Sequence, residues 1–359
     1  MLSLELLARQ LVERGGSDLH IAAGSPPMMR IDGCLVPAGE EKLPSDITRK
    51  LVFGILNAEQ VERFEQELEL DMSFGIEGLG RFRTNVFMQR DAVGAVLRVI
   101  PHETLPFEEL GLPPQACERI GNLRKGLVLV TGATGSGKST TLSSMVDQIN
   151  ASRTEHIMTI EDPIEFIHPN KSCLVNQREV GTDTHGFQNA LRTALRQDPD
   201  VIMVGEIRDQ ETISAALTIA ETGHLTFATL HTNSVVQTVN RVIDVFPAHQ
   251  QAQVRTQLSF TLEAIFCQQL VPRKGERGRV LAAEVLMATP AARALVREDK
   301  VHQLESVVQT GGRLGMTTMN QSLLKHCNDG QISFKNALRY SPTPEDIERM
   351  YKKTGGVCV

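Results

Sequence analysis

The sequence lacks tryptophan and contains only two tyrosines and thirteen phenylalanines in 359 residues. It also lacks an excess of basic residues, since its formal net charge is -6 and its pI is near 6.0. Proteins that coat nucleic acids usually carry a basic surface and aromatic side chains on which bases stack. The composition therefore argues against a nucleic-acid translocase, and it predicts a core built mostly from aliphatic side chains.

Closely spaced cysteines are also absent. No two of the six cysteines form a C-x-x-C pair, which disfavours a zinc site built from thiolates. Scattered cysteines in a chain of this size are typical of reduced, buried thiols in a cytosolic protein. The six positions are Cys34, Cys117, Cys173, Cys267, Cys327 and Cys358.

Long apolar runs are missing as well. No stretch approaches the roughly 20 apolar residues that are needed to span a bilayer. Near the N-terminus, Glu5, Arg9 and Glu13 interrupt any apolar run, so we do not predict a signal peptide there. We therefore expect a cytosolic protein that does not insert into a membrane, and that acts at a membrane only through partners.

The chain is long enough for two domains. Residues 1–100 predict a small mixed α+β domain, and the prolines within 101–112 predict a linker. From residue 113 onward, short apolar runs alternate with helical stretches, which is typical of a parallel sheet flanked by helices. We assign 113–359 to this α/β domain and expect its last part, from about 290, to be helical.

Several elements of the first domain can be predicted from local patterns. Asp32-Gly33 stands between two apolar runs, and this dipeptide favours a hairpin because type I′ turns need a positive φ at both central positions. Further strands are expected at about 81–89 and 94–100. Ser45 is expected to cap a single helix that extends through Val61.

Four short apolar runs of the second domain predict strands of the parallel sheet. Ligands of such sheets bind beyond the carboxyl ends of the strands. The residues that follow each run are therefore the first candidates for a functional site. The four runs are Leu127–Val130, Ile157–Ile160, Val201–Val204 and Thr226–Leu230.

A glycine-rich loop follows the first of these runs and opens a helix. Its sequence GATGSGKST, residues 132–140, fits the P-loop pattern, whose backbone N–H groups surround phosphate oxygens. Lys138 would reach the β- and γ-phosphates of ATP, and the Ser139 hydroxyl would ligate Mg²⁺. The residues expected to bind the nucleotide are Gly132, Thr134, Gly135, Ser136, Gly137, Lys138, Ser139 and Thr140.

Acidic residues and a histidine follow the other runs. Glu161 and Glu206 are candidates to hold Mg²⁺ and to orient the attacking water, because hydrolysis of ATP needs both tasks. The sequence does not assign one task to each residue; we favour Glu206 for the metal and Glu161 for the water. His231 follows the fourth run and could bond to a γ-phosphate, although a lone histidine beside a strand is more often structural.

Three arginines of the first domain form another candidate group. Alternation along a strand puts Arg81 and Arg83 on one face, and Arg98 lies on the next strand. These guanidinium groups either form a solvated face or reach a nucleotide held by the second domain. In the second case they would stabilise the charge of the transition state as arginine fingers do.

Taken together, these motifs resemble a known family. The segments GATGSGKST, TIEDPIE, LRQDPDVIMVGEIRD and GHLTFATLHTNS are similar, in this order, to the Walker A, Asp box, Walker B and His box of type II/IV secretion ATPases. The resemblance extends through SDLHI, PPMMRIDG, GRFRTNVF, CLVNQREVG and RVIDVFP, and so covers essentially the whole chain.

Within this superfamily the chain most resembles the retraction ATPases of type IV pili. Residues 290–300 are similar to the AIRNLIRE motif of those motors and depart from it at Ala292, Ala294 and Val296. Assembly ATPases of the superfamily usually carry a large additional N-terminal region and a four-cysteine zinc site. Neither feature is found in this sequence, which favours retraction.

The resemblance implies a PAS-like N-terminal domain, a RecA-like ATPase domain and a homo-hexameric ring in which first-domain arginines approach the nucleotide. It further implies a cytoplasmic motor at the inner-membrane base of the pilus machine. Such a motor acts on a platform protein of the inner membrane to remove pilins during twitching motility, and a paralogous retraction ATPase can work beside it. The alternatives are a pilus-assembly or type II secretion ATPase, and a nucleotide-regulated scaffold that scarcely hydrolyses ATP.

Overall fold

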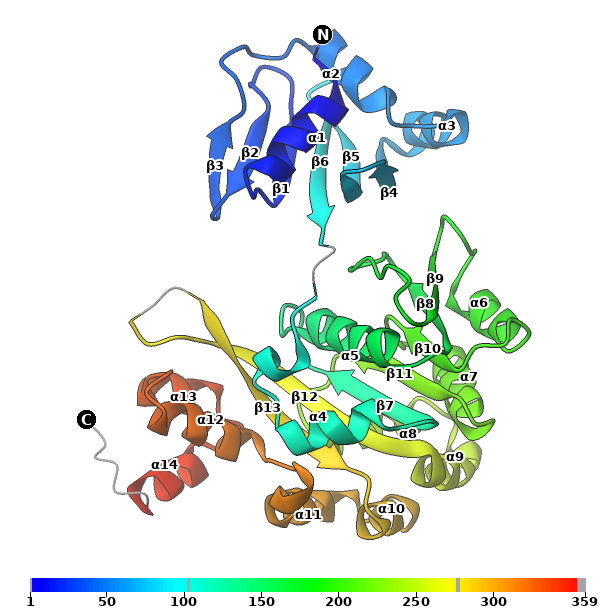
Figure 1. The fold of residues 1–359 in the computed structure, drawn as a ribbon, viewed down its shortest axis with the longest axis vertical. Helices are drawn as coiled ribbons and strands as arrows, with labels where there is room; N and C mark the ends of the chain where they lie inside the picture. Colours follow the sequence, from blue (N-terminus) through cyan, green and yellow to red (C-terminus); the bar gives the residue numbers. More distant parts are fainter. Residues whose placement is uncertain (1, 102–103, 276–277, 354–359) are drawn as a thin grey trace. The chain divides into compact units, whose positions relative to one another are not determined.

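The chain is divided into two structural units (Figure 1). The computed structural model describes residues 2–101, 104–275 and 278–353. The first unit consists of Met1–Glu103 and Pro163–Ile167, and the second of Thr104–Asp162 and His168–Val359. A short segment from the middle of the chain therefore groups with the N-terminal unit.

The first unit contains an antiparallel sheet. Its strands are β1 (Asp18–Ile21), β2 (Met28–Ile31), β3 (Cys34–Pro37), β4 (Glu69–Ile76), β5 (Gly80–Gln89) and β6 (Ala92–Ile100). Among the described residues, these strands lie in the order β3-β2-β1-β6-β5-β4, so that β1 and β6, far apart in the sequence, pair at the centre. The strands expected at 81–89 and 94–100 are confirmed as β5 and β6, whereas β4 was not predicted.

The β2–β3 hairpin confirms the turn expected at Asp32-Gly33. Ile31 pairs with Cys34 across the turn, and φ is 50° at Asp32 and 82° at Gly33. Two consecutive positive φ values are the type I′ geometry, whose twist matches that of the flanking strands. Aspartate tolerates the left-handed region and glycine adopts it freely, so this dipeptide turns the chain here.

Helices cover the first sheet. The described helices of this unit are α1 (Leu4–Glu13), α2 (Ser45–Phe53) and α3 (Ala58–Glu67). The single helix expected to extend from Ser45 to Val61 is wrong, because α2 ends at Phe53 and Ser45 is its first helical residue rather than its N-cap. Asn57 then starts α3 with a capping box, in which Asn57 and Gln60 each accept a hydrogen bond from the backbone N–H of the other.

The core between this sheet and its helices is mostly aliphatic, as the composition predicts. Phe64 and Phe82 are its largest buried aromatic side chains, and Leu19 and Leu97 are fully buried beside them. Burial of one such side chain contributes about 1.5–3 kcal/mol to stability.

The second unit contains a largely parallel sheet. Its strands are β7 (Gly126–Thr131), β8 (His156–Glu161), β9 (Leu174–Glu179), β10 (Val201–Val204), β11 (Leu225–Leu230), β12 (Leu262–Pro272) and β13 (Arg279–Met287). Within the described part of the chain, the strand order is β13-β12-β7-β11-β10-β8-β9. Among the described strands of this sheet, only the β12–β13 pair is antiparallel; the pairs from β12 to β9 are parallel.

All four strands predicted from apolar runs are present, as β7, β8, β10 and β11, and each bound agrees to within one residue. Strands β9, β12 and β13 were not predicted. The four predicted strands are buried along almost their whole length, which is why continuous apolar runs revealed them.

An α-helix precedes the parallel strands, and others connect them. Those before the last hairpin are α4 (Pro114–Gly121), α5 (Lys138–Ser152), α6 (Phe187–Ala194), α7 (Gln210–Glu221), α8 (Val235–Asp244) and α9 (Ala248–Thr261). The connection from β7 to β8 crosses the sheet in one direction, and those from β9 through β12 return in the other. Because crossovers between parallel strands are right-handed, α5 covers one face and α6–α9 cover the other (Figure 1).

The C-terminal part is helical, as expected, and its last helices pack against the β12–β13 hairpin (Figure 1). Its helices are α10 (Pro290–Arg297), α11 (Leu304–Thr310), α12 (Met319–Asn328), α13 (Phe334–Tyr340) and α14 (Pro344–Lys353). Val271 and Val280 of the hairpin share a small core with Leu323 and Ile347 of these helices. Together the two units confirm the predicted fold class, an α+β unit followed by an α/β unit.

The cysteines differ in part from the expected pattern. Cys117, Cys173 and Cys267 are buried, but Cys34 is exposed and Cys327 is partly exposed, so the expectation of buried thiols is wrong for these two. Cys358 lies outside the described residues. Among the described residues, none of the helices is both long and apolar enough to cross a bilayer.

A buried carboxylate joins the hairpin to the start of α8. Glu284 of β13 is 8% exposed, and its Oε2 accepts a hydrogen bond of 3.2 Å from the backbone N–H of Val235, the first residue of α8. Burial raises the pKa of Glu284 to about 7, and the charge of Glu305 adds to this effect, against the hydrogen bond from Val235. The carboxyl group therefore keeps its proton in the folded protein at pH values where an exposed glutamate has lost it.

This raised pKa predicts a specific dependence of stability on pH. Between pH 4.5 and 7 the folded state holds a proton on Glu284 that the unfolded state releases, so the free energy of unfolding falls as pH rises. The variant Glu284→Gln keeps an acceptor for Val235 and removes the titration. We expect the stability of the wild type relative to this variant to fall by on the order of 3 kcal/mol across this window.

The measurement is urea unfolding followed by circular dichroism at several pH values from 4.5 to 8. The exposed Glu118, replaced by glutamine, serves as a control that should follow the wild type. Parallel pH profiles for the wild type and Glu284→Gln would contradict the prediction.

Candidate active site

The backbone of the loop between β7 and α5 leaves no room for side chains at its first glycine. Gly132 has a φ of 143°, and a Cβ there would stand well inside 3.0 Å of the backbone oxygen of Gln268. Gly137, with a φ of 92°, is the N-cap of α5, and among the described residues no side chain caps this helix. The N–H groups of the first turn of α5 are thus available to an anion.

The side chains of this loop lie around the same turn. Lys138 donates hydrogen bonds from Nζ to the carbonyl oxygens of Gly132 at 2.8 Å and Ala133 at 3.1 Å. Its ammonium group therefore lies over the loop. Ser136 is 4% exposed and faces Gly132. The remaining loop residues expected to bind a nucleotide are exposed or half-buried: Thr134, Gly135, Gly137, Ser139 and Thr140.

Parallel pairing brings the loop and the other candidate residues of the second unit to one edge of the sheet. Thr131 at the end of β7 pairs with Leu230 at the end of β11, and the N–H of Gly132 donates to the Leu230 carbonyl at 3.3 Å. Val204 at the end of β10 pairs with Ala228 of β11 and with Ile160 of β8. The loop and the residues after β11, β10 and β8 therefore follow four neighbouring strands.

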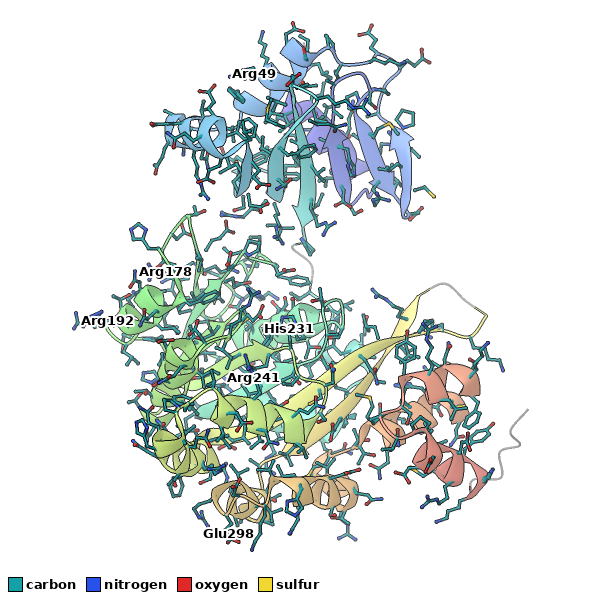
Figure 2. The ribbon with its side chains drawn as sticks, turned by 180° about the vertical axis from the view of Figure 1, so that it is seen from behind. Arg49, Arg178, Arg192, His231, Arg241 and Glu298 are labelled. Atoms are coloured by element: carbon teal, nitrogen blue, oxygen red, sulfur yellow. The ribbon has the colours of Figure 1, made fainter. Side chains whose placement is uncertain are left out.

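Glu206 lies at the centre of a charged cluster on this edge. Its carboxylate accepts hydrogen bonds from Nε of Arg208 at 2.5 Å and from Nη2 of Arg208 at 2.7 Å, and Nε2 of His231 lies 3.0 Å from its Oε1. Burial favours the protonated form of Glu206, but these hydrogen bonds and the positive charges outweigh it and lower its pKa. Glu206 is therefore ionised at neutral pH. His231 is labelled in Figure 2.

Glu161 ends β8 and is buried, with 4% of its surface exposed. Its Oε1 accepts a hydrogen bond of 2.6 Å from the Thr159 hydroxyl and one of 3.3 Å from Nε2 of Gln177. A Cβ added to Gly205 would stand 3.2 Å from Cα of Glu161, so the backbone just before Glu206 passes directly against this residue. The structure therefore brings the two candidate glutamates close together.

The turn that carries Glu206 is attached to both neighbouring strands. The N–H of Gly205 donates to the carbonyl of Ile160 at 2.8 Å, and the N–H of Ile207 donates to the carbonyl of Thr229 at 3.1 Å. The Thr229 hydroxyl donates to the carbonyl of Gly205. These bonds fix the backbone on either side of Glu206.

The three candidate arginines belong to the first unit, so they form a group of their own. Arg81 and Arg83 lie on the same face of β5, because the residues between and beyond them are buried, and Arg83 pairs with Arg98 on β6. Arg81 donates to the Ser73 hydroxyl, at 2.6 Å from Nη2. Arg83 is exposed. The alternation predicted for Arg81 and Arg83 is thus present.

Arg98 has a partner that sequence reasoning missed. Asp18 of β1 pairs with it across the sheet, and Nε of Arg98 lies 2.7 Å from Oδ1 of Asp18, which is 4% exposed. Burial acts to raise the pKa of Asp18, but hydrogen bonds from Ser17 and Arg98 overcome this and lower it. Asp18 therefore carries a negative charge that holds the guanidinium group of Arg98 in place.

Two residues of the second unit were also missed. Arg208 is the principal partner of Glu206, and Gln177 contacts Glu161 from the neighbouring strand. The sequence contains a signal for the Arg208–Glu206 contact. Arg208 follows Glu206 by two residues, and this spacing allows its guanidinium group to bond to both oxygens of the carboxylate. Gln177 has no such local signal, since its contact depends on how β8 and β9 pair.

The chemistry of these residues fits a nucleotide with Mg²⁺. The loop offers unblocked helix N–H groups and one ammonium group to phosphate oxygens. Ser139 and the ionised Glu206 offer the oxygen ligands that Mg²⁺ prefers. Any side chain at Gly132 would obstruct the loop backbone, which is the restriction expected of a loop that follows phosphates closely.

Comparison with known proteins gives close matches along nearly the whole chain. Residues 7–339 match the type II/IV secretion system protein family. The type IV pilus retractation ATPase PilT of Pseudomonas aeruginosa is 51% identical over 343 residues, which cover 96% of this chain and 99% of that relative. The type IV pilus ATPase PilU of the same organism is 43% identical over 351 residues, covering 98% of this chain and 92% of that relative.

The fold is similar to that of a solved structure. The crystal structure of the pilus retraction motor PilT with bound ADP matches with a TM-score of 0.91 and 47% sequence identity, covering 98% of this chain and 100% of that one. This likeness confirms the expected fold, an N-terminal domain followed by a RecA-like ATPase core. From the family match and the relatives together, the chain belongs to the type II/IV secretion system protein family.

Proposed function

We propose that this chain is an ATPase that drives retraction of type IV pili and thereby twitching motility. The observation that carries this proposal is the edge of the parallel sheet, where the phosphate loop, His231, Glu206 and Glu161 follow neighbouring strands. Relatives named for pilus retraction match this chain over nearly their full length, which supports the assignment of this site to a retraction motor.

In the proposed site, the P-loop holds the nucleotide and two oxygen ligands hold its Mg²⁺. Bound ATP would supply the phosphoanhydride bond that is broken. Mg²⁺ would supply a positive charge that stabilises the phosphates. Lys138 and the first turn of α5 bind the phosphate oxygens, and Ser139 and Glu206 hold the metal. The lowered pKa of Glu206 suits this role, because the carboxylate is charged at neutral pH.

Glu161 is the residue that we assign to the attacking water. Its carboxylate can orient a water molecule and accept a proton from it. Because hydrogen bonds from Thr159 and Gln177 already hold this carboxylate, it can do so without rearrangement. We assign a bond with the γ-phosphate to His231, and its position beside Glu206 supports this role. The buried position of Glu161 and the charged cluster around Glu206 support the assignment of Glu206 to the metal and Glu161 to the water.

The proposal includes an assembly and a location. We place the chain in a homo-hexamer in the cytoplasm, at the inner-membrane base of the pilus machine, where Arg81, Arg83 and Arg98 stabilise the transition state as arginine fingers. The hydrogen bond that Arg98 donates to Asp18 supports this role for Arg98, because it fixes the direction of the guanidinium group. An inner-membrane platform protein is the proposed partner, and the match to PilU supports a paralogous ATPase as a second one.

The segment 290–300 supports retraction rather than assembly. Its first part forms α10, and Glu298, labelled in Figure 2, follows the last residue of this helix. Arg293 of this helix bonds to the carbonyl oxygens of Ser259 and Phe260 and to Glu263 at 2.6 Å. Arg293, one of the two arginines shared with the motif of retraction motors, therefore attaches α10 to the end of α9.

Binding of ATP can be tested at the first glycine of the loop. Gly132→Ala puts a Cβ against the backbone of Gln268 at a φ that alanine rarely adopts, so the loop must shift. We expect affinity for a fluorescent ATP analogue to fall by about tenfold or more, the factor for about 1.4 kcal/mol. Gly186→Ala is the matched control, because Gly186 has extended backbone and no described heavy atom beyond its chain neighbours lies within 4 Å of its Cβ position.

The two variants are compared in one titration, and their thermal midpoints are measured by circular dichroism. The prediction is wrong if Gly132→Ala binds the analogue as the wild type does, or if Gly186→Ala loses as much affinity.

The cellular role can be tested by deleting the gene in its host and counting surface pili by electron microscopy. We expect excess pili on cells that no longer twitch, because assembly continues while removal has stopped. The wild-type gene and Lys42→Ala, a change at an exposed lysine, should restore twitching, whereas Lys138→Ala should not. Cells without pili would instead identify an assembly ATPase.

A further inference from the structure

Gln177 lies beside the proposed water-orienting glutamate, although it is on a different strand. It belongs to β9, the edge strand, and pairs directly with Thr159 of β8, while Glu161 pairs with Glu179 two residues further on. Side chains two residues apart on a strand share a face. Thr159, Glu161 and Gln177 therefore share one face of the β8–β9 pair; the adjacent Arg178 is labelled in Figure 2.

The amide of Gln177 uses both of its polar ends. Its Oε1 accepts a hydrogen bond of 2.7 Å from the backbone N–H of His168, and its Nε2 donates one of 3.3 Å to Oε1 of Glu161. Because a backbone N–H requires an acceptor, the bond from His168 decides which way the amide faces. The NH₂ group is thereby turned toward the carboxylate.

These two bonds join the ends of one loop. Glu161 is the last residue of β8, and His168 is the residue at which the chain returns to the second unit after Pro163–Ile167. Gln177 contacts both residues and so holds the two ends of this loop against the edge strand. The carboxylate of Glu161 and the base of the loop are therefore attached to the same side chain.

The carboxylate of Glu161 needs such a partner. It is 4% exposed, and a buried carboxylate without hydrogen-bond donors is strongly destabilising. The bonds from Thr159 and Gln177 both reach Oε1, from two directions. Two donors on one oxygen restrict the rotation of the carboxylate plane and thus set the direction of the second oxygen, Oε2.

We infer that Gln177 is a positioning residue for ATP hydrolysis, which holds the Glu161 carboxylate in the orientation needed to direct the attacking water. This inference rests on the proposed role of Glu161. Gln177 does not touch the nucleotide in this scheme, so its removal affects the rate of the chemical step and leaves binding of ATP in place.

The test is steady-state phosphate release by the purified full chain over a range of ATP concentrations. Gln177→Leu removes both bonds, and we expect kcat to fall by roughly ten- to a hundredfold, as for other misplaced catalytic groups. KM for ATP and the affinity for a fluorescent analogue should stay within about twofold. Gln177→Glu keeps an acceptor for His168 but replaces the donor by a like charge, so it preserves the loop and should lower kcat as well.

Asn176→Leu is the matched control, since it changes the neighbouring amide on the opposite face of β9, where Asn176 contacts His156. We expect its kcat to equal that of the wild type. A loss in Asn176→Leu as large as that in Gln177→Leu would overturn the inference, because general damage to the edge strand would explain both. Circular dichroism establishes that each variant is folded, and Gln177→Glu tests the inference even if Gln177→Leu does not fold.

The variant Glu161→Gln tests the role of Glu161 separately from the role of Gln177. Wild-type turnover by Glu161→Gln would contradict the role of Glu161 itself, whatever the Gln177 variants do. Loss of turnover in Glu161→Gln together with wild-type kcat in both Gln177 variants would overturn the role of Gln177 alone. In the Glu161→Gln background, Gln177→Leu should cause little further loss in a single-turnover assay, because the two residues act as one unit.

Discussion

The register of the parallel strands β7, β11, β10 and β8 decides where every candidate residue of the second unit lies. The pairs Thr131–Leu230 and Val204–Ala228 bring the strand ends level, so the loops after them meet at one edge. A slip of one residue would move a strand by about 3.3 Å and turn its side chains to the other face. The contact of His231 with the Glu206 carboxylate and the approach of Gly205 to Glu161 both depend on this alignment.

The surroundings of each buried or half-buried carboxylate then determine its charge. Glu206 faces a guanidinium group and an imidazole, and its pKa is lowered despite burial. Glu284 receives one backbone N–H and lies near another carboxylate, and burial raises its pKa to about 7. The same side chain is thus a charged group suited to a metal at the strand ends, and a protonated group suited to packing between β13 and α8.

Local sequence patterns predicted the parts of the fold that local physics determines. The buried strands β7, β8, β10 and β11 are short apolar runs, and Asp32-Gly33 turns the chain by its own φ preference. The single helix expected after Ser45 was wrong because the signal for a second start, Asn57 with Gln60, was not used. Strands β9, β12 and β13 were missed because polar residues interrupt their apolar runs, and pairing with neighbouring strands of the sheet stabilises them.

The candidate site shows the same division between local and distant causes. The P-loop, Glu161, Glu206 and His231 could be named from the sequence, because each carries its chemistry directly after an apolar run. Asp18 contacts an arginine eighty positions away in the chain, and Gln177 contacts Glu161 only because β9 pairs with β8. Residues that act by holding a reactive group owe their position to strand pairing. The sequence therefore reveals which groups can react, whereas the residues that orient these groups are found only in the structure.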